Sequence, residues 1–161
     1  MWEGRFITAK RHGRWEYVAR SRGIRAAVIL AIDDGHVLLV EQYRVPLGKN
    51  CIELPAGLVG DHNNDEDASA AAIRELEEET GYRAETMEDC GQYYSSPGMV
   101  SENFTLFKAH GLTKVSDGGG VDGENITVHR VAINELNDFI ERKRKDGNAI
   151  DVRLLLFSNP V

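Results

Sequence analysis

The stretch EDASAAAIRELEEETGY, residues 66–82, predicts a single helix around which the rest of the chain is organised. Asp67 precedes a run of alanines and belongs to the residue types that cap a helix N-terminus, and alanine has the highest helix propensity. Gly81 suits the left-handed residue that follows a helix. The sequence therefore predicts a helix from about residue 68 to residue 80.

Three carboxylates share one face of this predicted helix. Glu75, Glu78 and Glu79 are three and four positions apart, and like charges at that spacing repel one another. A divalent cation such as Mg²⁺, which takes oxygen ligands and is often shared with substrate phosphates, would turn the repulsion into attraction. Arg74 lies four residues before Glu78, where a charge-assisted hydrogen bond would hold that carboxylate in place. We therefore expect a metal site for phosphate chemistry.

Composition excludes several classes of protein. A chain of 161 residues suits one domain, and its 42% hydrophobic and 28% charged residues are ordinary for a globular protein. The net charge of −7 argues against a nucleic-acid partner, and no apolar run is long enough to span a membrane. Cys51 and Cys90 are too few for a disulfide framework. We expect both to be buried thiols in a cytoplasmic enzyme.

Hydrophobic patterns on both sides of the helix predict an α+β fold, built on a mixed β-sheet or arranged as a three-layer sandwich. The glycine-bearing segment 55–60 is expected to turn the chain towards the helix, and the Gly-rich segment 112–123 to be mobile. The expected strands cover residues 5–10, 14–20, 24–33, 36–43, 51–54, 83–94, 103–109 and 126–132. The expected further helices cover residues 133–145 and about 150–157.

Two features outside the helix have both structural and functional interpretations. Trp15 and Tyr17 lie on one side of a predicted strand, where they either pack in a core or interface or form a platform for a nucleobase. Arg44 ends another strand, where it is either a solvated surface residue or a bidentate phosphate ligand. The pattern alone leaves both pairs of alternatives open.

The helix carries a motif of high specificity, and on it the chain is identified as a member of the Nudix hydrolase superfamily. The motif, G-x5-E-x7-R-E-U-x-E-E-x-G-U with U apolar, is matched by Gly60, Glu66, Arg74, Glu75, Leu76, Glu78, Glu79, Gly81 and Tyr82. In similar members the glycine of Pro-Ala-Gly begins the motif, but here Gly57 lies nine positions before Glu66. We attribute the difference to a three-residue insertion in the polar loop 61–65.

Within the superfamily the chain resembles the ADP-ribose pyrophosphatase branch. Residues 41–59, Pro97 and the segment 120–131 carry this resemblance. It implies the Nudix fold, an α/β/α sandwich around a mixed sheet, with an N-terminal β-hairpin extension at 1–22 and the hydrolase domain at 23–161. It also implies metal-dependent hydrolysis of the pyrophosphate bond of ADP-ribose or a related nucleoside diphosphate sugar, giving a nucleoside monophosphate and a sugar phosphate.

The resemblance further implies where the metal and the catalytic base lie. Mg²⁺, with Mn²⁺ as an alternative, would be held by the Ala56 carbonyl together with the three glutamates of the helix. The general base would be Glu124 on the late loop, with Glu102 as its competitor and Asp117 and Asp122 as weaker candidates.

The same resemblance implies a substrate site that two subunits share. Trp15 is the best candidate for stacking on adenine, with Trp2 and Tyr17 as alternatives. Arg44 would bind phosphate, and Pro97 would line the substrate site. The implied assembly is a homodimer.

Two other functions remain open at this stage. The same chemistry could act on another dinucleotide, such as NADH or a dinucleoside polyphosphate. A non-catalytic nucleotide-sensing module on the same fold is the third possibility, although a sensor has no need of the repulsive cluster at Glu75, Glu78 and Glu79.

Overall fold

The computed structural model describes residues 1–21, 25–59, 67–121 and 123–157. Gly60 and Glu66 of the motif, the expected insertion at 61–65 and the candidate base Asp122 lie outside the described residues. Within the described ranges no helix is long and apolar enough to cross a membrane.

Strands dominate the chain, and only two segments form α-helices in the described residues. The strands are β1 (Trp2–Glu3), β2 (Ile7–His12), β3 (Trp15–Arg20), β4 (Arg25–Asp33), β5 (His36–Arg44), β6 (Lys49–Glu53), β7 (Ala56–Val59), β8 (Tyr82–Arg83), β9 (Thr86–Tyr94), β10 (Asn103–His110), β11 (Thr113–Lys114), β12 (Thr127–Ala132) and β13 (Ala149–Ile150). The helices are α1 (Ala68–Thr80) and α2 (Leu136–Lys145), with 3-10 turns at η2 (Val45–Leu47), η3 (Ile133–Glu135) and η4 (Val152–Phe157).

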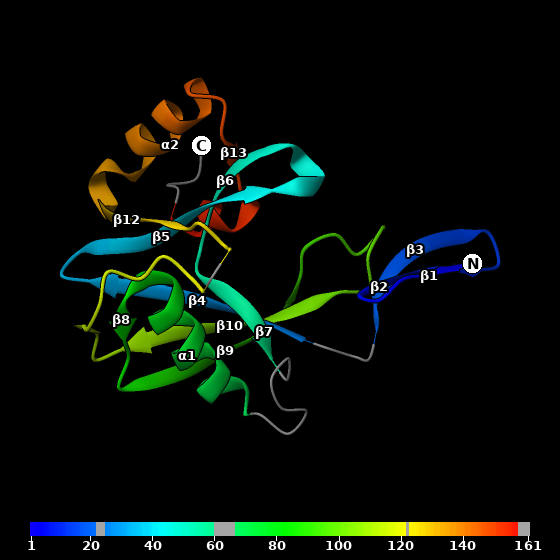
Figure 1. Ribbon diagram of the computed structural model, residues 1–161, viewed down its shortest axis with the longest axis horizontal. Helices are drawn as coiled ribbons and strands as arrows, with labels where there is room; N and C mark the ends of the chain where they lie inside the picture. The colour runs from blue at the N-terminus through cyan, green and yellow to red at the C-terminus, as the bar shows by residue number, and fades with distance from the viewer. Residues whose placement is uncertain (22–24, 60–66, 122, 158–161) are drawn as a thin grey trace.

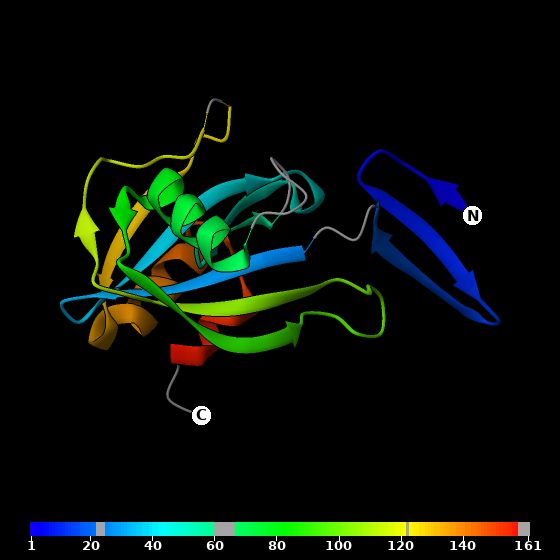
Figure 2. The ribbon, with the colours of Figure 1, turned by 90° about the horizontal axis from the view of Figure 1, so that it is seen from below.

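A mixed eight-stranded sheet forms the centre of the molecule. Its strand order is β13-β6-β5-β4-β10-β9, and β12 and β7 pair with β5 and β4 respectively. The pairs β10–β4 and β13–β6 are parallel, while the other pairs are antiparallel. Helices α1 and α2 cover opposite sides of this sheet (Figures 1 and 2). The expected sandwich around a mixed sheet is therefore confirmed.

Alternation along the central strand β4 builds a core on each face. Ala27 and Ile29 pack in one buried cluster with Leu76 of α1. Val28, which points the other way because successive strand residues alternate, packs in a second cluster with Phe139 of α2. A single apolar strand thus supports both helices.

The structure differs from the sequence expectations in two connecting segments. The expected turn at 55–60 instead contains strand β7, which runs antiparallel to β4 with Ala56 opposite Val28. The expected helix at 150–157 is replaced by strand β13, which pairs with β6, and the 3-10 turn η4. In both cases a neighbouring strand edge offers hydrogen bonds that a local sequence pattern does not reveal.

The N-terminal residues form a small sheet of their own. The expected hairpin is confirmed as β2 and β3, and β1 adds a third antiparallel strand. This sheet stands apart from the central one (Figures 1 and 2). It meets the loop between β9 and β10, where the Val18 N–H donates to the Met99 carbonyl and the Ser101 N–H donates to the Val18 carbonyl, each at 2.9 Å.

Candidate active site

The ends of helix α1 are fixed as the sequence predicted. The Asp67 side chain accepts hydrogen bonds from the backbone N–H groups of Ser69 at 3.0 Å and Ala70 at 3.2 Å. Gly81 follows the helix at φ 75° and ψ 12°, in the left-handed region. Leu76 and Thr80 are buried beneath the helix. These contacts set the rotation of α1 and so decide where its carboxylates point.

Arg74 ties two of the expected metal-binding carboxylates together. Its Nη1 atom lies 3.0 Å from Glu78 Oε2 and 3.0 Å from Glu75 Oε1. The guanidinium offsets part of the repulsion between these two acids. The positioning role expected for Arg74 towards Glu78 is consistent with this geometry, and the contact with Glu75 adds to it.

Glu79 is buried, which the sequence did not indicate. The residue is 5% exposed, and its Oε2 atom accepts a hydrogen bond of 3.0 Å from the Ala56 N–H. Burial raises the pKa of Glu79 to about 8; the Ala56 hydrogen bond lowers it, and the nearby charges of Glu75 and Glu124 raise it further. A carboxylate in this position favours either a proton or a cation beside it.

Gly57 makes room for the neighbouring carboxylate. A Cβ atom added at Gly57 would lie 1.9 Å from Glu75 Cδ, so that the side chain of Glu75 rests directly on the backbone of β7. Burial also raises the pKa of Glu75; Arg74 opposes this effect, and the charges of Glu78 and Glu124 add to it. The absence of a side chain at position 57 therefore shapes the acidic site.

The Gly-rich segment after β11 packs on the C-terminal end of α1. The Gly119 N–H donates to the Glu79 carbonyl and the Gly120 N–H to the Glu78 carbonyl, both at 2.9 Å. A Cβ atom at Gly118 would lie 2.4 Å from the backbone carbon of Thr80. Glycine permits this close packing of two backbones, and the mobility expected for the segment 112–123 stays a prediction.

This packing brings Glu124 to the acidic face of the helix. The Glu124 charge is close enough to raise the pKa values of Glu75 and Glu79. Its own Oε2 atom accepts a hydrogen bond of 3.0 Å from the Val121 N–H. Asp117, a weaker candidate base, is exposed and pairs with Lys114 at 3.3 Å. The structure thus places Glu124 with the predicted metal ligands.

A cavity of about 570 Å³ opens beside this face of the helix. Its walls come from α1 and from the Gly-rich segment, and the lining residues are Ala70, Ile73, Arg74, Glu77, Glu78, Ser116, Gly118 and Gly120. Of the expected metal ligands, Glu78 lines this cavity, together with the positioning residue Arg74.

Arg44 is held by a buried partner. Its Nε and Nη2 atoms donate to the two carboxylate oxygens of Glu53 at 2.6 and 2.8 Å. Glu53 is 4% exposed, whereas the Arg44 side chain is 40% exposed. The Arg44 charge also lowers the pKa of Glu79, which places the guanidinium within electrostatic range of the acidic site.

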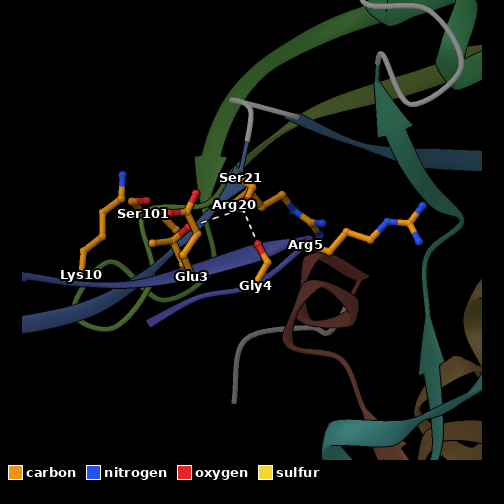
Figure 3. Close-up of a pocket in the computed structure, with 9 residues that line it drawn as sticks. Glu3, Gly4, Arg5, Lys10, Arg20, Ser21 and Ser101 are labelled. Carbon is orange, nitrogen blue, oxygen red and sulfur yellow. Dashed lines mark hydrogen bonds between the residues drawn. The ribbon is translucent and has the colours of Figure 1, made fainter. Parts of the chain in front are cut away.

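The remaining predicted residues lie with the N-terminal sheet. Glu102 forms an ion pair with Arg20 of β3, Pro97 is exposed in the loop that bonds to β3, and Trp15 is 62% exposed. A second cavity, of about 750 Å³, lies on this sheet, and Figure 3 shows Arg20 and Ser101 among the residues that line it. Glu102 is thus paired with the N-terminal sheet, whereas the charge of Glu124 acts on Glu75 and Glu79 of α1.

The chemistry of the acidic site suits a divalent cation. Burial raises the pKa values of Glu75 and Glu79, and the Glu75 side chain lies against the backbone of β7 at Gly57. Their carboxylate oxygens are the kind of ligand that Mg²⁺ prefers. Within residues 1–21, 25–59, 67–121 and 123–157, no three acidic, histidine or cysteine side chains are already arranged around one point. Arg74 bridges Glu75 and Glu78, so these carboxylates would have to turn to share an ion.

Comparison with known proteins shows the family of the chain. The model of the NUDIX domain family matches residues 22–152. A methanol dehydrogenase activator of Bacillus methanolicus is 39% identical over 73% of this chain and 63% of its own length. An ADP-ribose pyrophosphatase of Bacillus subtilis is 32% identical over 73% of this chain and 62% of its own length. The chain thus spans less than two thirds of either relative.

A solved structure gives the same fold. The crystal structure described as an ADP compounds hydrolase superposes with a TM-score of 0.64 over 84% of this chain and 80% of its own. Sequence identity with it is 21%, so the likeness concerns the fold.

Proposed function

Because the chain belongs to the Nudix family, we propose that it is a metal-dependent hydrolase of the pyrophosphate bond in ADP-ribose or a related nucleoside diphosphate sugar. The products would be a nucleoside monophosphate and a sugar phosphate. The observation that carries this proposal is the burial of Glu79 beside Glu75 and Glu124. The ADP-ribose pyrophosphatase among the relatives supports the choice of substrate class.

The carboxylates of Glu75, Glu78 and Glu79, with the Ala56 carbonyl, would hold Mg²⁺ or Mn²⁺. When bound, the ion neutralises charge on the phosphate oxygens and polarises a water molecule. This neutralisation matters because a pyrophosphate is anionic and repels a nucleophile. Arg74 keeps two of these carboxylates on the same side of the helix.

Two further side chains act directly on the reactants. Glu124 removes a proton from the attacking water as the oxygen–phosphorus bond forms and the bridging P–O bond breaks. Arg44 binds a phosphate oxygen through the edge of its guanidinium that Glu53 does not occupy.

Adenine recognition is proposed to need a second copy of the chain. Trp15 belongs to the sheet β1–β3, which stands away from the layers that hold the acidic helix (Figure 2). A homodimer would bring this sheet, and the loop containing Pro97, to the partner's acidic site. A sedimentation experiment that finds only monomers at assay concentrations would contradict this part of the proposal.

We also place the enzyme in the cytoplasm, because Cys51 and Cys90 are free thiols and no disulfide joins the described residues. Cys51 is buried as expected, whereas Cys90 is partly exposed.

A substrate panel with product analysis tests the proposal. ADP-ribose, ADP-glucose, GDP-mannose, NADH and a dinucleoside polyphosphate would each be incubated with Mg²⁺ or Mn²⁺. We expect ADP-ribose to yield AMP and ribose 5-phosphate. Cleavage of NADH or the dinucleoside polyphosphate alone would favour the other dinucleotide function, and tight binding without turnover would favour a sensing module.

A further inference from the structure

We propose that Glu53 is a positioning residue, held by Arg153 of the C-terminal segment, that fixes Arg44 in the orientation required to bind substrate phosphate. The inference rests on the proposed function because it assigns Arg44 to phosphate binding. It adds two residues, on strand β6 and on η4, that lie outside the motif and outside the acidic helix.

The first step is the geometry of the guanidinium. Glu53 accepts from Nε and Nη2 of Arg44, which fixes one edge of the planar group. The third nitrogen, Nη1, has no hydrogen-bond partner among the residues that the structure describes, and the side chain is 40% exposed. Arginine has a long side chain whose freedom is lost on binding, so a partner that orders it beforehand reduces the cost of binding an anion.

The second step is the way in which Glu53 itself is held. Arg153 Nη2 lies 3.5 Å from Glu53 Oε2, and the same guanidinium donates to Asp151 at 2.7 and 2.6 Å. The Arg153 guanidinium also lies 5.5 Å from the centre of the Phe104 ring. Negative and positive charges therefore alternate from Asp151 through Arg153 and Glu53 to Arg44. A buried carboxylate between two arginines has a compensated charge and a defined orientation.

The third step connects this network to the acidic site. Glu53 is three residues before Ala56, whose N–H donates to Glu79. Movement of Glu53 would therefore displace the phosphate-binding arginine relative to the carboxylates with which it has to cooperate.

Glu53→Gln tests the role of Glu53 most directly, because it keeps the size of the side chain and removes its charge. We expect KM for ADP-ribose to rise by about tenfold while kcat changes by less than about threefold. Arg153→Met should raise KM by about threefold, since it loosens Glu53 without touching Arg44. Arg144→Met is the matched control, because Arg144 forms an exposed pair with Glu141 on α2, and KM should not change.

A second set of variants, made in an Arg44→Ala chain, distinguishes a positioning role of Glu53 from a general loss of folded structure. In an Arg44→Ala chain, Glu53→Gln should add less than about twofold to KM, because the residue it positions is already gone. An equal rise in both backgrounds would overturn the inference, and so would an unchanged KM. A fall in KM would also overturn it, since Glu53 would then compete with phosphate for Arg44.

Calorimetry distinguishes failure of the role inferred for Glu53 from failure of the proposed function. The dissociation constant of ADP-ribose is measured in EDTA for the same variants, so that no turnover is needed. A wild-type chain that binds ADP-ribose but does not cleave it contradicts the proposed function, and the affinities of the variants still decide the role of Glu53. A wild-type chain that does not bind ADP-ribose in EDTA and does not cleave it with Mg²⁺ overturns both.

Discussion

Adding one methyl group at Gly57 should damage the acidic site far more than the fold. The added Cβ would lie 1.9 Å from Cδ, 2.2 Å from Cγ and 2.3 Å from Oε1 of Glu75. Carbon atoms in contact are separated by about 3.5 Å, so the carboxyl group has to retreat by about 1.5 Å. The clash is with the end of a flexible side chain, which can rotate away from β7.

The expected loss of catalytic rate is larger than the expected loss of stability. Misplacing a reacting or ligating group by about 1 Å costs on the order of 100-fold in rate. Overpacking costs about 1–3 kcal/mol of stability in a closely packed region, and we expect the low end because Glu75 is partly exposed. Gly57→Ala should therefore lower kcat by about 100-fold and the free energy of unfolding by about 1 kcal/mol.

The assay compares Gly57→Ala, Glu75→Ala and the double variant. Steady-state hydrolysis of ADP-ribose at saturating Mg²⁺ gives kcat, and urea unfolding gives stability. The added methyl group acts through Glu75. The kcat of the double variant should therefore lie within about twofold of the kcat of Glu75→Ala. Wild-type activity in Gly57→Ala would refute the reasoning, and so would fully additive losses in the double variant.

Further predictions concern the acidic residues Glu124, Glu102 and Glu41. Glu124→Gln should lower kcat by about 100-fold or more with little change in the affinity for ADP-ribose. Glu102→Gln should change kcat by less than about threefold. The reverse pattern would identify Glu102 as the general base. Burial would raise the pKa of Glu41, but hydrogen bonds from Lys143, Asn50, His129 and Asn148 outweigh it and lower that pKa from 4.5 to about 2. The resulting stability, at most about 3 kcal/mol, is present above pH 4.5 and is lost as the pH falls towards 2, so urea unfolding should show the gap between wild type and Glu41→Gln shrinking from pH 7 to pH 3. An equal gap at both pH values would contradict this.

Local chemistry explains why helix α1 was predictable. Its cap at Asp67, its alanines and its terminating glycine act within a few residues of one another, so the sequence alone contains the signal. The strands β4 and β5 were equally clear, since each is a continuous apolar run around a turn at Asp34-Gly35. Arg74 and the three carboxylates follow from helical spacing.

The rest of the site depends on contacts between distant segments. Nothing in the residues around Glu79 indicates that β7 covers it, because the donor is the backbone N–H of Ala56, 23 positions away. The choice between Glu102 and Glu124 likewise depended on which loop packs against α1. The pairing of Arg44 with Glu53 carried a weak signal, since the two residues occupy neighbouring strands of a hairpin, but Arg153 comes from the far end of the chain.

Product analysis under metal control tests the central claim most directly. The wild-type chain and Glu78→Gln are incubated with ADP-ribose in Mg²⁺, in EDTA, and in EDTA followed by excess Mg²⁺, and the products are identified by phosphorus NMR. The wild type should form AMP and ribose 5-phosphate only when Mg²⁺ is present and recover fully after EDTA, while Glu78→Gln should form neither product at a comparable rate. Hydrolysis that survives EDTA, or that proceeds unchanged in Glu78→Gln, would contradict a metal-dependent site on this helix.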